Sequence, residues 1–138
     1  MGIFLMFIKK RTEGVILLLS VGGGGLLNYV LKSIYERQRP DFERVIEASG
    51  FSFPSGHAMN AVTFYGMLAM ILFFIVQKEK MKIVVCVGFS ILILLIGVSR
   101  VYLGVHYVSD ILAGYLAGLA WLIAMLLIYR SILLERKL

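Results

Sequence analysis

The stretch AMNAVTFYGMLAMILFFIV, Ala58 to Val76, is a run of nineteen residues without a charge. A helix rises about 1.5 Å per residue, so roughly 20 such residues cross the hydrocarbon core of a bilayer. Three further uncharged runs of similar length occupy residues 14–31, 83–99 and 111–129. Lipid offers no water to unpaired backbone groups, and none of the runs alternates as a barrel strand does, so the sequence predicts four transmembrane helices.

The composition agrees with a membrane protein. The chain has 138 residues, of which 60% are hydrophobic, and a mean hydropathy of +0.92, whereas about half of the residues in a soluble domain are apolar. We therefore expect an all-α fold, an integral membrane bundle with four helices in this chain. A single domain over residues 1–138 is expected, with spans at about 14–35, 57–77, 82–100 and 107–130.

The net charge of +6 falls on one side of the predicted membrane. That side carries nine basic and three acidic residues: Lys9, Lys10, Arg11, Lys78, Lys80, Lys82, Arg130, Arg136 and Lys137 against Glu13, Glu79 and Glu135. The other side has five of each sign: Lys32, Arg37, Arg39, Arg44 and Arg100 against Glu36, Asp41, Glu43, Glu47 and Asp110. The positive-inside rule makes the basic side cytoplasmic, so both termini are expected in the cytoplasm. Because topology explains the basic excess, nucleic acid is not an expected partner.

Four consecutive glycines, Gly22 to Gly25, lie in the middle of the first predicted span. Small residues allow helix backbones to approach closely in lipid, so we expect these glycines to serve helix packing. A hinge in the first span is the alternative interpretation.

Polar clusters lie at the non-cytoplasmic ends of the spans, where ionisable groups suggest function. The first is KSIYERQRP, in which Lys32 and Arg39 share a face two turns apart if the helix continues to the proline. The second is PSGH, residues 54–57. The third is SRVYLGVHYVSD, in which His106 and Asp110 have helical i, i+4 spacing. A four-helix bundle places these ends side by side, so the clusters are expected to form one site.

Phosphate is the expected ligand of this site. Lys32, Arg39 and Arg100 supply three cations, and guanidinium groups match phosphate oxygens. The backbone amides around residues 55–57 open a helix N-terminus, which attracts anions. His106, with Asp110 in reach, has the arrangement of an imidazole oriented by a carboxylate for attack on phosphorus.

His57 is the second histidine of the site, and it is expected to act as a general acid that protonates the leaving alcohol. Arg37, Arg44 and the outer glutamates are expected to be interfacial anchors without a role in the site. A zinc site made by His57, His106 and Asp110 is the alternative. The three cations disfavour it, because they would repel a metal ion.

The three clusters resemble the tripartite signature of the type 2 phosphatidic acid phosphatase superfamily, which also includes vanadium haloperoxidases and glucose-6-phosphatases. All eleven fixed positions match in order: Lys32, Arg39 and Pro40, then Pro54, Ser55, Gly56 and His57, then Ser99, Arg100, His106 and Asp110. The resemblance covers residues 32–110.

The resemblance implies a role for each matching residue. Lys32, Arg39 and Arg100, with Ser55 and the amide of Gly56, would hold the phosphate. His106 would form a phosphohistidine with help from Asp110. His57 would protonate the leaving group, and water would then release phosphate without a metal or another cofactor.

The resemblance also implies a larger membrane domain than this chain has. Integral members usually have six membrane helices, with the signature on the last four. Residues 1–8 have their apolar positions before the first charges, as at the end of a preceding helix. We therefore expect that the first two helices of the family core are missing from this chain.

The expected function is that of a lipid phosphatase in the plasma membrane, with its active site on the extracytoplasmic side. The expected substrate is phosphatidylglycerol phosphate, with undecaprenyl pyrophosphate as the alternative, or a broad range of phosphatidic acid and lipid pyrophosphates. Membrane lipids are the other expected partners. A haloperoxidase is disfavoured by the four spans. A non-catalytic relative is disfavoured because His57, His106 and Asp110 are all retained.

Overall fold

The computed structural model describes residues 11–41 and 45–135, with side chains to residue 132, and residues 1–8, expected to be the end of a preceding helix, lie outside this range. The described residues form α2 (Arg11–Tyr35), α3 (Gly56–Ala61), a π-helical turn η1 (Val62–Gly66), α4 (Met67–Ile75), α5 (Glu79–Tyr102) and α6 (Val108–Glu135). The segments α3, η1 and α4 join into one span, so four helices are long and apolar enough to cross a membrane. The all-α fold with four spans is confirmed.

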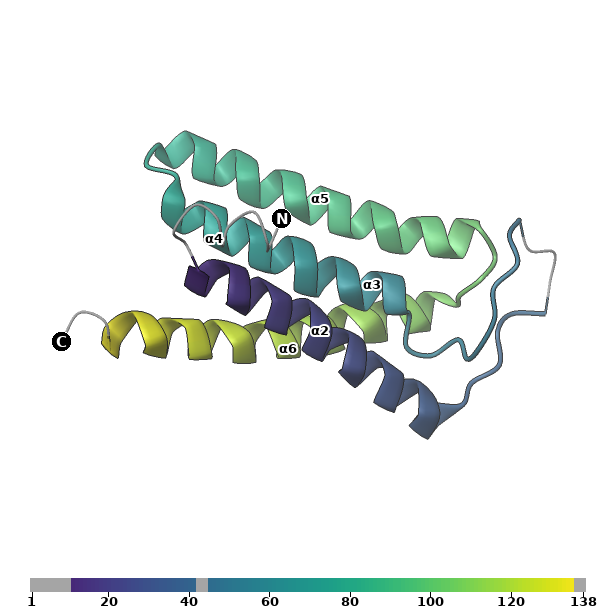
Figure 1. Ribbon diagram of the computed structural model, residues 1–138. Helices are drawn as coiled ribbons and strands as arrows, with labels where there is room; N and C mark the ends of the chain where they lie inside the picture. The colour runs from purple at the N-terminus through teal and green to yellow at the C-terminus, as the bar shows by residue number, and fades with distance from the viewer. Residues whose placement is uncertain (1–10, 42–44, 136–138) are drawn as a thin grey trace.

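The helices run back and forth between two ends of a bundle (Figure 1). The loop after α2 and the connection between α5 and α6 meet at one end, whereas the α4–α5 turn and the last turns of α6 lie at the other. The apolar core between the helices is formed by Ile16, Leu17, Val62, Met67, Ile71, Leu122, Met125 and Tyr129. The clusters that carry the polar motifs therefore gather at the first end.

Glycines of α6 allow close contacts with the span formed by α3, η1 and α4. A Cβ atom added to Gly114 would lie 2.7 Å from the carbonyl oxygen of Ser55, and one added to Gly118 would lie 2.9 Å from Cβ of Val62. This is the small-residue spacing that lets backbones approach in lipid. The start of α3, which carries the PSGH motif, is therefore held directly against α6.

The glycine run of α2 divides into two pairs. Gly23 and Gly24 face Trp121 and Thr63 at distances that leave no room for a Cβ atom, whereas Gly22 and Gly25 have nothing within 4 Å. The packing interpretation therefore fits Gly23 and Gly24.

The π-helical turn interrupts the second span at Val62–Gly66. A π turn shifts backbone carbonyls out of the regular helical pattern, and such turns are frequent at functional sites. Here the hydroxyl of Ser20 on α2 donates to the carbonyl of Thr63 at 2.9 Å, and the indole of Trp121 donates to the carbonyl of Ser20 at 2.9 Å. These bonds satisfy polar groups inside the bundle and tie α2 to η1 and α6.

The helix α5 is packed least. In its most apolar window, 6% of residues are buried, compared with 50% for Gly56–Ile75. Gly97 is its only buried residue, and the ring of Tyr115 lies against it. Most of the surface of α5 is therefore available to lipid.

Candidate active site

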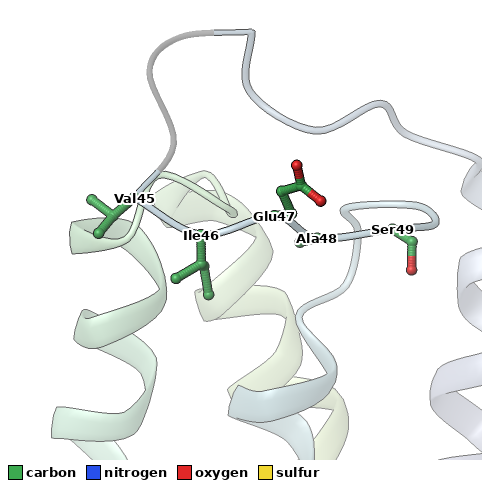
Figure 2. A pocket seen from close by; sticks show the side chains of 5 residues that line it. All are labelled: Val45, Ile46, Glu47, Ala48 and Ser49. Atoms are coloured by element: carbon green, nitrogen blue, oxygen red, sulfur yellow. The ribbon is translucent and has the colours of Figure 1, made fainter.

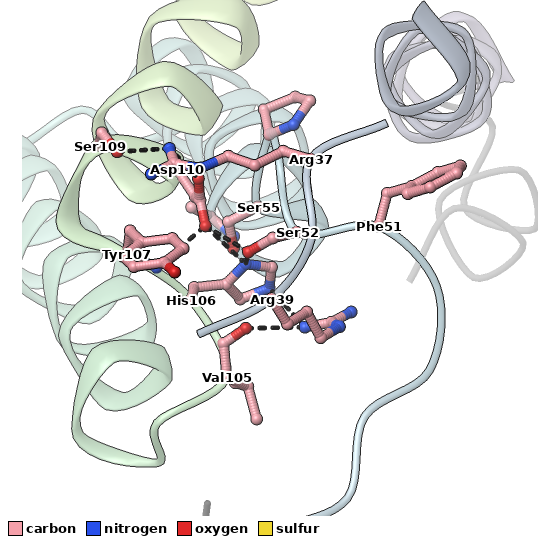
Figure 3. A network of polar contacts seen from close by, with 12 residues as sticks. Arg37, Arg39, Phe51, Ser52, Ser55, Val105, His106, Tyr107, Ser109 and Asp110 are labelled. Atoms are coloured by element: carbon pink, nitrogen blue, oxygen red, sulfur yellow. Dashed lines mark hydrogen bonds and ion pairs between the residues drawn. The ribbon is translucent and has the colours of Figure 1, made fainter. Parts of the chain in front are cut away.

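Three segments meet at the end of the bundle that carries the polar motifs: the chain that follows α2, the segment before α3, and the connection between α5 and α6 (Figure 3). The backbone N–H of Ser55 donates to the carbonyl of Asp110 at 3.0 Å, and that of Ser52 donates to the carbonyl of Arg37 at 2.7 Å. These bonds join the segment before α3 to the other two segments. The convergence expected from topology is therefore present in the structure.

The carboxylate of Asp110 lies at the centre of the polar network and is fully buried. One oxygen, Oδ1, accepts from Nη1 of Arg37 at 2.9 Å. The other, Oδ2, accepts from the hydroxyl of Ser52 at 2.5 Å and from the backbone N–H of Tyr107 at 2.9 Å. The bond from Tyr107 is one half of a capping box, in which a side chain in the first turn satisfies an N–H at the helix start.

His106 lies beside Asp110 but not on its helix. The sequence placed His106 and Asp110 together at the start of the fourth span, whereas α6 begins at Val108 and His106 precedes it. The two side chains still meet, because Nδ1 of His106 is 3.4 Å from Oδ2 of Asp110 and 3.3 Å from the hydroxyl of Ser52. A carboxylate can only accept, so the proton of neutral His106 lies on Nδ1 and Nε2 carries the lone pair.

The surroundings of His106 favour the neutral imidazole. The side chain is 3% exposed. Burial, followed by the charge of Arg39, lowers the pKa of His106 from 6.5 to about 4, although Asp110 opposes the shift. An unprotonated Nε2 is what a nucleophile requires.

Lys32 and Arg39 reach the site by a path different from the predicted one. The helix does not continue to the proline but ends at Tyr35, and Glu36 follows it with φ of 43°. The prediction that Lys32 and Arg39 share a helical face, which required the helix to continue to the proline, is therefore wrong. The polar segment after Tyr35 turns towards α6, where Arg37 contacts Asp110.

Lys32 and Arg39 are held by backbone carbonyls, most of them in the segment before α3. Lys32 donates to the carbonyls of Phe51 and Ser52. Arg39 donates to the carbonyls of Gly50 at 3.0 Å, Ser49 at 2.9 Å and Val105 at 2.9 Å, and its Nη1 is 3.5 Å from Nε2 of His106. Arg39 thus faces the ring nitrogen from which an attack on phosphorus would start.

Ser55 caps the start of α3. Its hydroxyl accepts from the N–H of Ala58 at 3.4 Å, and its side chain is fully buried. Gly56 is the first residue of the helix, and an added Cβ atom there would meet the side-chain oxygen of Asn28 at 3.0 Å. A helix N-terminus that begins beside His106 and Asp110 is therefore present at the expected position.

His57 and Arg100 stand apart from the hydrogen-bonded network. His57 is exposed and lies within electrostatic range of Arg100, Arg39 and Lys32. The Nε of Arg100 donates to the hydroxyl of Ser99 at 3.2 Å. Within the part of the chain that the structure describes, neither side chain has a hydrogen bond with His106 or Asp110.

A cavity of about 540 Å³ opens beside His57. It extends down the span from Gly56 and His57 to Phe64 and Tyr65, between α2 and α5. A separate hollow of about 590 Å³ lies along Val45–Ser49 in the loop (Figure 2). The cavity beside His57 borders the polar site, and a further one of about 450 Å³ is lined in part by Arg39.

The zinc alternative is not supported by the ligand geometry. Over residues 11–41 and 45–135, no three His, Cys, Asp or Glu side chains are placed to hold a metal ion. His57, His106 and Asp110 therefore do not form the proposed set of ligands.

Three residues of the site were missed by the sequence analysis. Arg37 was assigned to the interface, but it forms an ion pair with Asp110. Ser52 bridges Asp110 and His106, and Asn28, which is 7% exposed, donates to the carbonyl of Pro54 at 3.4 Å. A polar residue within a span is a signal that could have identified Asn28, whereas the sequence around Arg37 and Ser52 has no periodicity that indicates their contacts.

Comparisons with known proteins agree with the signature. The family model described as PAP2 superfamily matches residues 13–133. A phosphatidylglycerophosphatase B from Bacillus subtilis (strain 168) is 43% identical over 122 residues, which cover 86% of this chain and 59% of that protein. An undecaprenyl-diphosphatase from Sulfolobus acidocaldarius is 29% identical over 127 residues, which cover 88% of this chain and 57% of that protein.

A solved structure has the same arrangement of helices. The crystal structure of a transmembrane PAP2 type phosphatidylglycerolphosphate phosphatase from Bacillus subtilis superposes with a TM-score of 0.86 at 40% identity. The match covers 95% of this chain and 66% of that one. The chain thus spans less than two thirds of the length of these relatives.

Proposed function

The chain belongs to the PAP2 superfamily, and on this premise we propose that it is a membrane phosphatase that hydrolyses a lipid phosphate through a phosphohistidine, without a metal. The observation that carries the proposal is the buried contact between His106 and Asp110, 3.4 Å apart, with Lys32 and Arg39 beside it. This arrangement offers a neutral nitrogen nucleophile next to cations that match phosphate.

Binding of phosphate replaces contacts that the protein makes with itself. Lys32 and Arg39 now donate to backbone carbonyls, and phosphate oxygens, which are charged acceptors, compete well for these donors. The amides of Gly56 and His57 at the start of α3, the Ser55 hydroxyl and Arg100 complete the proposed binding set. The phosphorus then lies next to Nε2 of His106.

The first chemical step is attack of Nε2 of His106 on phosphorus. The N–P bond forms while the bond between phosphorus and the lipid oxygen breaks, and His57 gives its proton to the departing oxygen. Asp110 stabilises the positive charge that develops on the imidazole. In the second step water attacks phosphorus, His57 takes a proton from it, the N–P bond breaks and phosphate leaves.

Phosphatidylglycerol phosphate is the proposed substrate. The 43% identical relative is a phosphatidylglycerophosphatase B, and the protein in the solved structure is a phosphatidylglycerolphosphate phosphatase. The cavity that runs from His57 to Tyr65 gives apolar surface along the span for the lipid. Undecaprenyl pyrophosphate is the second candidate, because the 29% identical relative is an undecaprenyl-diphosphatase, and a broader range of lipid phosphates is the third.

The proposed location is the plasma membrane, with both termini in the cytoplasm and the site on the opposite side. The support is the charge distribution, because the loops at the site end are balanced while the other end is basic. The substrate would then reach the site from the outer leaflet.

The proposed activity and substrate are tested with purified protein in mixed lipid–detergent micelles that contain EDTA. Release of phosphate is compared for phosphatidylglycerol phosphate, phosphatidic acid and undecaprenyl pyrophosphate. We expect phosphatidylglycerol phosphate to have the highest kcat/KM, and His106→Ala to abolish turnover because it removes the nucleophile. His57→Ala should spare substrates with good leaving groups, because these need no proton.

Each contrary result contradicts a different part of the proposal. A strict requirement for added magnesium or zinc contradicts the mechanism. A higher kcat/KM for undecaprenyl pyrophosphate selects the second candidate, and equal losses of His57→Ala on all leaving groups contradict His57 as the acid.

A further inference from the structure

Two side chains that the proposed reaction does not use hold the carboxylate of Asp110. Arg37 donates to Oδ1 at 2.9 Å, and Ser52 donates to Oδ2 at 2.5 Å (Figure 3). Neither residue belongs to the eleven positions of the signature. Both come from the chain between α2 and α3, not from the helix that carries Asp110.

Contacts with two further residues hold the guanidinium of Arg37 in place. The same Nη1 also donates to the hydroxyl of Ser109 at 2.8 Å, and the guanidinium lies 4.1 Å from the ring centroid of Tyr107. Hydrogen bonds and a cation–π contact thus fix the guanidinium plane from two sides. Of the lysines and arginines that the structure describes, Arg37 alone lies within ion-pair distance of Asp110.

The carboxylate needs this partner because it is sealed from water. The side chain of Asp110 is 0% exposed, whereas that of Arg37 is 39% exposed. A buried charge without an opposite charge is costly, and the cost is reduced when a cation and hydrogen bonds surround it. Arg37, which is itself partly exposed to solvent, therefore supplies the opposite charge that the buried carboxylate requires.

Ser52 lies between Asp110 and His106. Its hydroxyl donates to Oδ2 of Asp110, and its oxygen is 3.3 Å from Nδ1 of His106, so it can accept part of the Nδ1–H bond. The bond from Nδ1 to Asp110 itself is long, at 3.4 Å. Ser52, which is fully buried, therefore shares with Asp110 the task of fixing the ring.

We propose that Arg37 and Ser52 are positioning residues that fix the Asp110 carboxylate and, through it, the orientation and tautomer of His106. This inference rests on the proposed function of His106 as the nucleophile. Neither residue is proposed to touch the phosphate. They act on the rate of the chemical step because a small displacement of a nucleophile lowers the fraction of productive encounters.

The expected kinetic result is a loss in kcat. Arg37→Gln and Ser52→Ala should each lower kcat by about ten- to a hundredfold, while the inhibition constant of inorganic phosphate changes by less than about twofold. Arg37→Lys should recover most of the rate, because it restores the cation. Matched controls are Arg130→Gln, on the exposed surface of α6, and Ser33→Ala, whose hydroxyl donates to carbonyls of its own helix.

A titration of His106 gives a readout that does not depend on activity. The charged groups that act on His106 are Asp110, Arg39 and Lys32, and loss of either Arg37 or Ser52 leaves more of the negative charge of Asp110 to act on the ring. The pKa of His106, followed by NMR of histidine-labelled protein, should therefore rise by about half a unit in both variants. The chain has only two histidines, so the His57→Ala background leaves one signal.

The outcomes separate the inference from the proposed function. If the wild type hydrolyses a lipid phosphate but kcat and the His106 titration are unchanged in both variants, the positioning role is wrong. If Arg37→Gln weakens inhibition by phosphate and leaves kcat intact, Arg37 is a phosphate ligand and the inference is also wrong. If the titration shifts while the wild type hydrolyses no lipid phosphate, the positioning role stands and the proposed function fails. Thermal melting identifies a variant that does not fold, and if Arg37→Gln is that variant, kcat and the His106 titration of Ser52→Ala carry the test.

Discussion

His106 lies in a setting that opposes its own protonation. Burial and the charge of Arg39 lower its pKa to about 4. The nucleophile must be neutral, so kcat/KM, which reports groups of the free enzyme, should stay high below pH 6.5 and fall only as the pH approaches about 4. A pH series of kcat/KM on one lipid phosphate measures this limb, and a midpoint at 6.5 would contradict it.

The same shift affects stability. The folded-state pKa of His106 is lower than its ordinary value of 6.5, so the unfolded chain binds the proton first as the pH falls. The contribution of neutral His106 to stability is therefore complete above about 6.5 and decreases from there towards about 4. The difference in melting temperature between the wild type and His106→Ala, followed across this pH range, separates the contribution of His106 from other effects of acid.

At the scale of residues, the sequence predicted those site residues that belong to a motif with fixed spacing. Lys32, Arg39, Ser55 and His106 are near one another in the structure, because each follows or opens a span at the same end of the bundle. Arg37 could not be distinguished in the same way. Its contact with Asp110 depends on the path of an irregular loop, which hydropathy and periodicity do not encode.

At the scale of elements, the contact between α3 and α6 positions the PSGH motif. A Cβ atom added to Gly114 would lie 2.7 Å from the carbonyl oxygen of Ser55. That neighbour is a backbone atom, so Gly114→Ala must displace the start of α3. We expect a destabilisation of about 1–3 kcal/mol and a reduced kcat, measured by thermal melting and phosphate release.

The chain offers a matched control on α2. An added Cβ atom at Gly22 meets nothing within 4 Å, and alanine is the better helix former. Gly22→Ala should therefore keep full activity with an unchanged or higher melting temperature. Equal losses in both variants would show that the spacing between α3 and α6 is not what matters.

The spans were predicted better than the details within them. Four uncharged runs identify four spans because lipid imposes length and apolarity together. The end of α2 at Tyr35 matches the predicted span of about 14–35, and the start of α6 at Val108 lies one residue from the predicted 107, whereas the π turn at Val62–Gly66 was not predicted. The carbonyl of Thr63 in this turn accepts a hydrogen bond from Ser20, a residue distant in sequence, and hydropathy does not encode such a contact.

At the scale of the whole molecule, the charge asymmetry predicts an orientation that can be measured. In a Cys86→Ala background, which removes the only cysteine, Glu47→Cys places a thiol in the loop at the site end and Lys80→Cys places one in the α4–α5 turn region. A membrane-impermeant maleimide applied to intact cells should label position 47 at once and position 80 only after permeabilisation. The opposite pattern would place the site in the cytoplasm.

The sparse packing of α5 has a practical consequence for purification. Bulky apolar side chains such as Ile91, Leu95 and Val98 are exposed along it, so the surrounding acyl chains supply most of its contacts. A short-chain detergent covers such a surface less completely than a bilayer does, and α5 is the helix that it loosens first. Because α5 carries Arg100 in its last turn, the choice of solubilising agent bears directly on the cation set of the site, and native lipids belong in the buffer.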